Sequence, residues 1–157
     1  MDEARFSILQ SEIETQIGVI ESIYKKIEER MKDMEKSELS LESSAYQLHN
    51  LYCAFEDLFR IVANFFENTI ENRRSYHIEL LRRMSISIEG IRPALLSAEA
   101  YKLLDNLRAF RHFFRHAYAY EIDSRKIKIV LEDAFRLRKI YQSLARNFLK
   151  SLKSSEK

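Results

Sequence analysis

The sequence predicts an all-α fold, a single-domain bundle of four long helices with a short fifth helix. Apolar residues recur at every third or fourth position over long segments, which is typical of helices with one buried face. Glycine and proline are scarce, since Gly18, Gly90 and Pro93 are the only ones in 157 residues. Because hairpin turns rely on such residues, the composition disfavours a mainly β architecture. The chain, residues 1–157, has the length of one domain with its own apolar core.

The first two predicted helices form a long antiparallel pair. The first runs from about residue 6 to residue 34, and the second from about residue 41 to residue 70. The segment 36–40 between them is short and polar, which indicates a turn between neighbouring helices. The second helix has the denser apolar set, with Tyr52 and Phe55 in it. We therefore expect it to contact more than one neighbour, a second subunit included.

A short helix is predicted next, over residues 76–85. The stretch that follows it cannot be a regular helix, because Pro93 disfavours helical backbone angles at Arg92. We expect this stretch to be a connection that leads to the next long helix.

The last two long helices each begin at a recognisable cap. Ser97 is the predicted N-cap of a helix over about 98–118. A break follows, and Asp123 or Ser124 is expected to cap the final helix, which is predicted to continue from about residue 125 to residue 152.

Charge and cysteine content exclude several classes of protein. The formal net charge is +2, so nucleic-acid binding would require a local cluster of basic residues. Cys53 is the single cysteine, which excludes an intrachain disulfide, and its apolar neighbours favour a buried, inert thiol. Residues 1–5 lack the pattern of a signal peptide, and no stretch has the length and apolarity of a membrane span. We expect a cytoplasmic protein without a membrane partner.

The helix predicted over 98–118 has one basic, histidine-rich face. On a helical wheel that face carries Arg108, Arg111, His112, Arg115, His116 and Tyr118. The opposite side carries Leu103, Phe110, Phe113, Phe114 and Ala117. Arginine matches phosphate oxygens, and histidine transfers protons near neutral pH. Together they suffice for metal-independent RNA cleavage, in which the ribose 2′-hydroxyl is the nucleophile. The alternative is a solvated face whose arginines pair with acids from other helices.

The histidines do not predict a metal site. His112 and His116 have a spacing that can hold a metal ion, but the glutamate of the zinc-protease motif is missing and flanking arginines repel a cation. His49 and His77 are expected at the surface or at an interface. No glycine-rich loop suited to phosphate binding is present, so no cofactor is predicted.

The segment from Arg111 to Tyr118 resembles the Arg-x4-His-x-Tyr motif of HepT-type HEPN ribonucleases, which are toxins of two-gene toxin–antitoxin modules. The family usually has a polar residue, often Asn, directly after the arginine, and His112 stands there in this chain. The helical context is similar too, including the Phe55-Glu56-Asp57-Leu58, Tyr76-His77 and Arg92-Pro93 segments. The resemblance covers roughly residues 41–152 and implies a HEPN-type bundle that forms a homodimer.

The resemblance also implies roles for residues. Arg111 and His116 would form the catalytic pair in a cleft at the dimer interface. These two residues point about 140° apart on an ideal helix, so we expect both subunits to contribute to one groove. Tyr118 corresponds to the tyrosine that a partner antitoxin, an MNT-family nucleotidyltransferase, modifies with AMP.

Other residues are expected to support the site. Arg108, Arg115 and His112 are candidate phosphate contacts for an RNA substrate such as a tRNA or an mRNA. Arg92 is expected either to cover the cleft or to fix its own loop through a salt bridge. Glu56 is expected to pair with an arginine near the site and to position it.

Two other functions fit the same sequence. One is a non-catalytic module of the same fold that binds RNA or a nucleotide. The other is a helical dimerisation partner whose long first helix recruits another protein.

Overall fold

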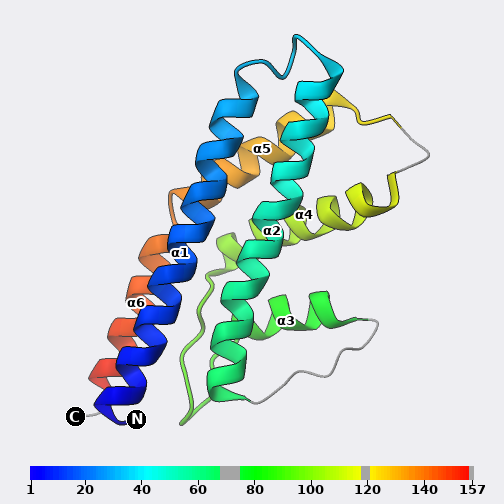
Figure 1. The fold of residues 1–157 in the computed structure, drawn as a ribbon. Helices are drawn as coiled ribbons and strands as arrows, with labels where there is room; N and C mark the ends of the chain where they lie inside the picture. Colours follow the sequence, from blue (N-terminus) through cyan, green and yellow to red (C-terminus); the bar gives the residue numbers. More distant parts are fainter. Residues whose placement is uncertain (68–74, 118–120, 156–157) are drawn as a thin grey trace.

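The computed structural model describes residues 1–67, 75–117 and 121–155, and in these ranges the chain is all-helical. Its helices are α1 (Glu3–Met31), α2 (Glu38–Phe66), α3 (Tyr76–Met84), α4 (Ala98–His116), α5 (Ser124–Arg138) and α6 (Tyr141–Ser154). Apart from the helices, the described residues contain an isolated β-bridge between Ile88 and Arg92. The predicted all-α class is therefore confirmed (Figure 1).

Helices α1 and α2 form the long antiparallel pair that the sequence predicts (Figure 1). The Asp2 side chain accepts a hydrogen bond from the backbone N–H of Arg5 and caps α1, and Ser37 caps α2 in the same way. The buried stripe of α1 consists of Leu9, Ile13, Ile20, Ile23, Tyr24 and Ile27. Apart from the adjacent pair Ile23 and Tyr24, these side chains recur at steps of three, four or seven residues. They therefore share one face of the helix, and that face packs on α2.

Helix α2 is at the centre of the bundle and packs against α1, α3, α4 and α5. Its dense apolar set explains this position, because Phe55, Leu51 and Phe59 are almost completely buried. A connection over residues 85–97 leads from α3 to α4. Two backbone N–H groups in it, those of Leu95 and Leu96, donate to the carbonyl of Met84 and so fix where α4 begins.

The predicted caps of the later helices are confirmed. The Ser97 hydroxyl accepts from the backbone N–H of Ala100 at 3.2 Å, and α4 begins at Ala98. Asp123 accepts from the backbone N–H of Arg125 at 2.9 Å, and α5 begins at Ser124.

The prediction of one continuous final helix was wrong. The chain turns at Lys139 and Ile140 and separates α5 from α6, although neither glycine nor proline is present there. The turn is held from outside: Arg138 pairs with Glu21 at 3.0 Å, and the Tyr141 hydroxyl donates to the same carboxylate at 2.6 Å. As a result α5 packs on α4 while α6 runs along α1 (Figure 1).

Glu21 is partly buried under these contacts. Burial by itself raises the pKa of its carboxyl, but hydrogen bonds from Tyr141, Arg138 and Gln142 outweigh that effect, and the pKa is lowered. The carboxylate therefore stays charged and holds the turn.

Among the residues that the structure describes, none of the helices combines the length and the apolar character that crossing a bilayer requires.

Candidate functional site

Helix α4 carries the arginines and histidines singled out in the sequence. Its inner face is anchored by Leu103, Leu104, Leu107 and Phe110, all buried in the core. The outer residues at its C-terminal end are therefore held on a rigid element. Phe113 and Phe114, predicted to face the core, are partly buried and pack against its edge.

Arg111 faces α2 and is half-buried. Its Nε donates to the Sγ of Cys53 at 3.3 Å. In the described part of the chain no carboxylate pairs with this guanidinium. A partly buried arginine without an acid partner is suited to binding an anion, since its fork of N–H donors remains available.

His49 lies on α2, one turn before that cysteine. Its Nε2 is 3.9 Å from the cysteine sulfur, and its ring centroid is 5.4 Å from that of Phe114. Burial lowers the pKa of His49, and the charges of Arg111 and Arg115 lower it further, against a hydrogen bond with Asn50. His49 is consequently neutral at neutral pH and adds no positive charge beside Arg111.

Tyr52 is fully buried, and its hydroxyl has no hydrogen-bond partner in the described residues. Burial raises the pKa of Tyr52, and the nearby carboxylate of Glu56 adds to this effect, so the hydroxyl stays protonated. The charges of Arg108 and Arg111 are close enough to act on it in the opposite direction. The hydroxyl is thus a buried donor without a hydrogen-bond partner among the described residues, and it feels the charges of the two arginines.

These residues define what we call the α2–α4 seam: His49, Tyr52, Cys53 and Glu56 on α2, and Arg108 and Arg111 on α4. Sequence reasoning missed the first three of them. It placed His49 at the surface or at an interface and Cys53 among inert core residues, whereas Cys53 is half-buried against Arg111. The signal available in the sequence was the spacing of the four α2 residues of the seam, which lie three or four positions apart and so share one face of the helix.

Glu56 is buried at the far end of the seam. Its carboxylate lies 2.6 Å from the Nδ1 of His77 on α3 and 3.4 Å from a guanidinium nitrogen of Arg60. The arginine partner expected for Glu56 is therefore Arg60, one turn further along α2, and not an arginine of α4. His77, expected at the surface or an interface, joins α3 to α2.

The other proposed phosphate contacts differ in their surroundings. Arg108 pairs with Asp105 at 2.8 Å, three residues earlier on the same helix. Arg115 is exposed and lines a hollow of about 370 Å³ together with Glu38, Glu42 and Glu121. Acidic side chains there oppose phosphate binding, so Arg111 is the α4 arginine best placed for an anion.

His112 and His116 lie side by side on the exposed face of α4, with ring centroids 4.6 Å apart. Arg111 turns inward and His116 outward, and no contact joins them within the described part of one chain. This separation agrees with the angle expected from the helical wheel. Tyr118 lies outside the described residues.

Arg92 ties its own loop to the ends of α2 and α3. Its guanidinium is fully buried, pairs with Glu67 at 2.8 Å, and donates to the carbonyls of Arg83, Ile86 and Pro93. Of the two roles considered for this residue, the geometry favours the salt bridge that fixes the connection between α3 and α4.

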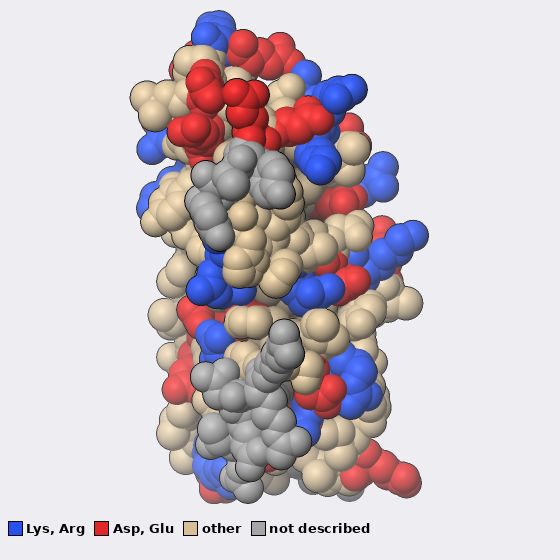
Figure 2. All heavy atoms as spheres, turned by 90° about the vertical axis from the view of Figure 1, so that its right-hand side faces the viewer, with Lys and Arg blue, Asp and Glu red and all other residues tan. Residues whose placement is uncertain are grey.

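The face that contains the ends of α3 and α4 is shown in Figure 2. Basic side chains lie across its middle, and acidic side chains gather at its upper end, where α2 begins. The positive charge is therefore local, as the nearly neutral composition requires. Within the described ranges, no group of three or more His, Cys, Asp or Glu side chains is arranged to hold a metal ion.

Fold and site together define a small helical protein. Its fourth helix presents two exposed histidines and an arginine that has no acid partner among the described residues. A family model of HepT-like proteins matches residues 43–152, most of the chain, and the protein belongs to this family. Membership places it among HEPN-type proteins related to toxin ribonucleases. The match begins inside α2 and leaves α1 outside. Neither the curated proteins nor the solved structures gave a match.

Proposed function

We propose that this protein is a metal-independent endoribonuclease, the toxin of a toxin–antitoxin pair, and that it acts as a homodimer. The observation that carries the proposal is the guanidinium of Arg111, which is half-buried beside the neutral His49 and has no carboxylate partner in the described residues. Family membership supports the same class of activity.

In the proposed reaction, Arg111 offsets the charge of the scissile phosphate. The 2′-hydroxyl of the preceding ribose attacks phosphorus and loses its proton, and the bond to the 5′-oxygen breaks. The departing 5′-oxygen takes up a proton, so the products are a 2′,3′-cyclic phosphate and a free 5′-hydroxyl. His116 transfers a proton in this step. Because Arg111 and His116 point apart in one chain, we propose that a second subunit completes the groove.

We further propose that a nucleotidyltransferase antitoxin inactivates the protein by attaching AMP to Tyr118. The support is the spacing of Tyr118, seven residues after Arg111, together with family membership. In this proposal the negative charge of the adduct competes with RNA phosphate for Arg111.

The test is induced expression in bacteria that lack the partner gene. We expect growth arrest and RNA degradation with the wild type and with the control Arg146→Ala, an exposed arginine on α6. Arg111→Ala and His116→Ala should not arrest growth. With purified protein and a chelator present, His116→Ala should cleave RNA about a hundredfold or more slowly.

Other outcomes would contradict parts of the proposal. Arrest by all four proteins, without RNA fragments, would indicate a binding module and not a nuclease. Cleavage that stops when the chelator is added would contradict the metal-independent mechanism. Light scattering should give about twice the chain mass of 18.7 kDa, and a monomer at micromolar concentration would contradict the shared groove.

A further inference from the structure

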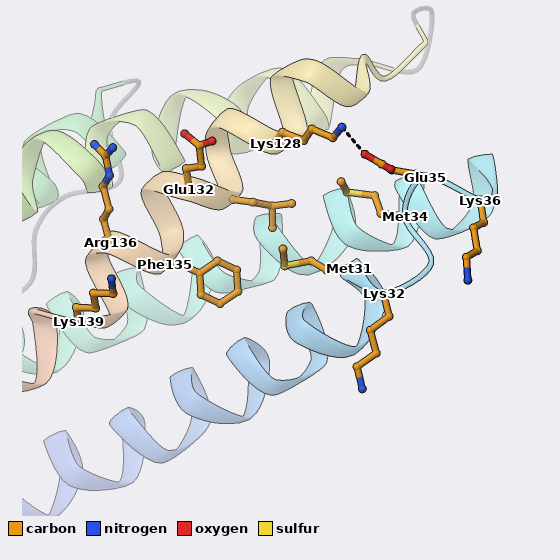
Figure 3. Close-up of a pocket in the computed structure, with 11 residues that line it drawn as sticks. Met31, Lys32, Met34, Glu35, Lys36, Lys128, Glu132, Phe135, Arg136 and Lys139 are labelled. Atoms are coloured by element: carbon orange, nitrogen blue, oxygen red, sulfur yellow. Dashed lines mark ion pairs between the residues drawn. The ribbon is translucent and has the colours of Figure 1, made fainter.

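A groove lies where α1 ends, between the turn at residues 32–36 and helix α5. Its volume is about 660 Å³. The apolar part of its lining consists of Met31, Met34, Leu131 and Phe135. Figure 3 shows Met31 and Met34 on one wall and Phe135 on the other, all turned toward the space between the walls. Met34 is almost fully buried, whereas Met31 is exposed and available for contact.

The rim of this α1–α5 groove is mainly basic. It carries Lys32, Lys36, Lys128, Arg136 and Lys139, against Glu35 and Glu132. Two of these cations are already paired, Lys128 with Glu35 and Lys36 with Asp33. In the described part of the chain, no acid partner pairs with Lys32, Arg136 or Lys139. Glu132 likewise has no basic partner there. The unpaired charge of the rim is therefore positive.

We propose that the α1–α5 groove binds an acidic amphipathic helix of a partner protein. Apolar side chains of that helix pack on Met31 and Phe135, and its carboxylates meet Lys32, Arg136 and Lys139. Methionine is flexible and polarisable, and it is common on surfaces that accept a helix.

The arrangement of the cations favours an acidic helix over a small apolar acid as the ligand of the groove. A small apolar acid has one anionic head, so cations would have to converge on a single point. In Figure 3 Lys32 projects on the opposite side of the groove from Arg136 and Lys139. Cations spread along both edges match an acidic helix, which presents several carboxylates along its length.

This inference does not depend on ribonuclease activity, because its evidence lies outside the α2–α4 seam. One wall, Met31 to Lys36, also lies outside the segment that matches the family, while the α5 wall lies inside it. Of the two rim acids, Glu35 is paired with Lys128, while Glu132 has no basic partner among the described residues and opposes an acidic partner protein. Removing the charge of Glu132 should therefore strengthen binding, which gives the test a variant with the opposite effect.

The probe is a fluorescein-labelled helical peptide with Leu and Phe on one face and Glu on the other. Its controls are the same peptide with Lys in place of Glu and a peptide of the same composition in scrambled order. Binding to the full chain is followed by fluorescence anisotropy at low and physiological salt. The protein variants are Met31→Asp, Arg136→Glu, Glu132→Gln and, as a control on α6, Lys153→Glu, each checked for helix content by circular dichroism.

We expect saturable binding of the acidic peptide that weakens with salt. Arg136→Glu should weaken it about threefold to tenfold, Glu132→Gln should strengthen it, and Lys153→Glu should leave it unchanged. Met31→Asp should weaken it about tenfold or more. Equal binding of the Lys peptide or the scrambled peptide, unchanged affinity in Met31→Asp, or displacement by low concentrations of dodecanoate would overturn the proposal. A change of molecular mass in Met31→Asp would assign the groove to a second copy of the chain and overturn it as well.

Discussion

Replacing Arg92 with alanine should strongly destabilise the protein without a direct effect on RNA chemistry. The side chain is fully buried and pairs with Glu67, itself only 8% exposed, at 2.8 Å. Three more hydrogen bonds of 3.0–3.1 Å reach the carbonyls of Arg83, Ile86 and Pro93. These four contacts hold the connection between α3 and α4, the helix that carries the motif.

The size of the effect follows from this geometry. Removing one member of a buried ion pair leaves the other charge uncompensated, which costs about 3–5 kcal/mol. Each hydrogen bond from a charged donor contributes roughly 1.5–3 kcal/mol, but the contributions overlap because water can reach the carbonyls once the side chain is gone. We therefore expect a loss of about 3–5 kcal/mol, equivalent to a fall in Tm of roughly 6–20 °C for a domain of this size.

The assay is urea unfolding at one fixed protein concentration, since subunit association would otherwise change the apparent stability. The control is Arg125→Ala, which removes an arginine that is 87% exposed and paired with Asp123. It should change stability by no more than about 0.5 kcal/mol. The double variant Arg92→Met with Glu67→Leu should recover much of the loss, because it leaves no buried charge.

The reasoning fails if Arg92→Ala unfolds within about 1 kcal/mol of the wild type. A variant of normal stability that no longer cleaves RNA would instead assign Arg92 to the cleft, the alternative that the sequence left open.

Three further predictions concern stability measured by the same unfolding assay. The pKa of His49 is lowered in the folded chain, mainly by burial, so the unfolded chain binds a proton at this residue first as the pH falls. The free energy of unfolding should therefore decrease between about pH 7 and pH 5. It should decrease less steeply in His49→Gln. Ser97→Ala removes the cap of α4 and should cost about 1 kcal/mol, whereas Ser154→Ala, near the end of α6, should have little effect. Phe59→Ala, at a fully buried position of α2, should cost about 3–5 kcal/mol, and a loss below about 1 kcal/mol would contradict its place in the core.

The helices and most of their ends could be predicted because their signals are local. Apolar residues spaced by three and four mark the buried stripes, and Ser97 and Asp123 act as caps whatever the rest of the chain does. The turn between α5 and α6 could not be predicted. It depends on Arg138 and Tyr141 reaching Glu21 on α1, and no local pattern reveals a contact between residues so far apart in sequence.

The candidate site also has a part that the sequence indicates and a part that depends on contacts between helices. The basic face of one helix and the resemblance to the family motif singled out Arg111 and His116, and their role in a site stays a prediction. The contribution of α2 was not identified, because His49 and Cys53 stand among apolar residues and read as part of the core or surface. The packing of α2 against α4 is what brings Cys53 into contact with Arg111, with His49 next to that cysteine.

The position of α1 has a consequence for how this protein can be dissected. The segment shared with the family starts at residue 43, yet six buried side chains of α1 cover α2. A fragment cut at residue 43 would present that face of α2 to water, and we expect it to aggregate or to remain partly unfolded. The segment that matches the family model is thus shorter than the segment that the native fold requires, because the fold also needs α1. A fragment that is to keep the native arrangement of the motif therefore has to include the first helix.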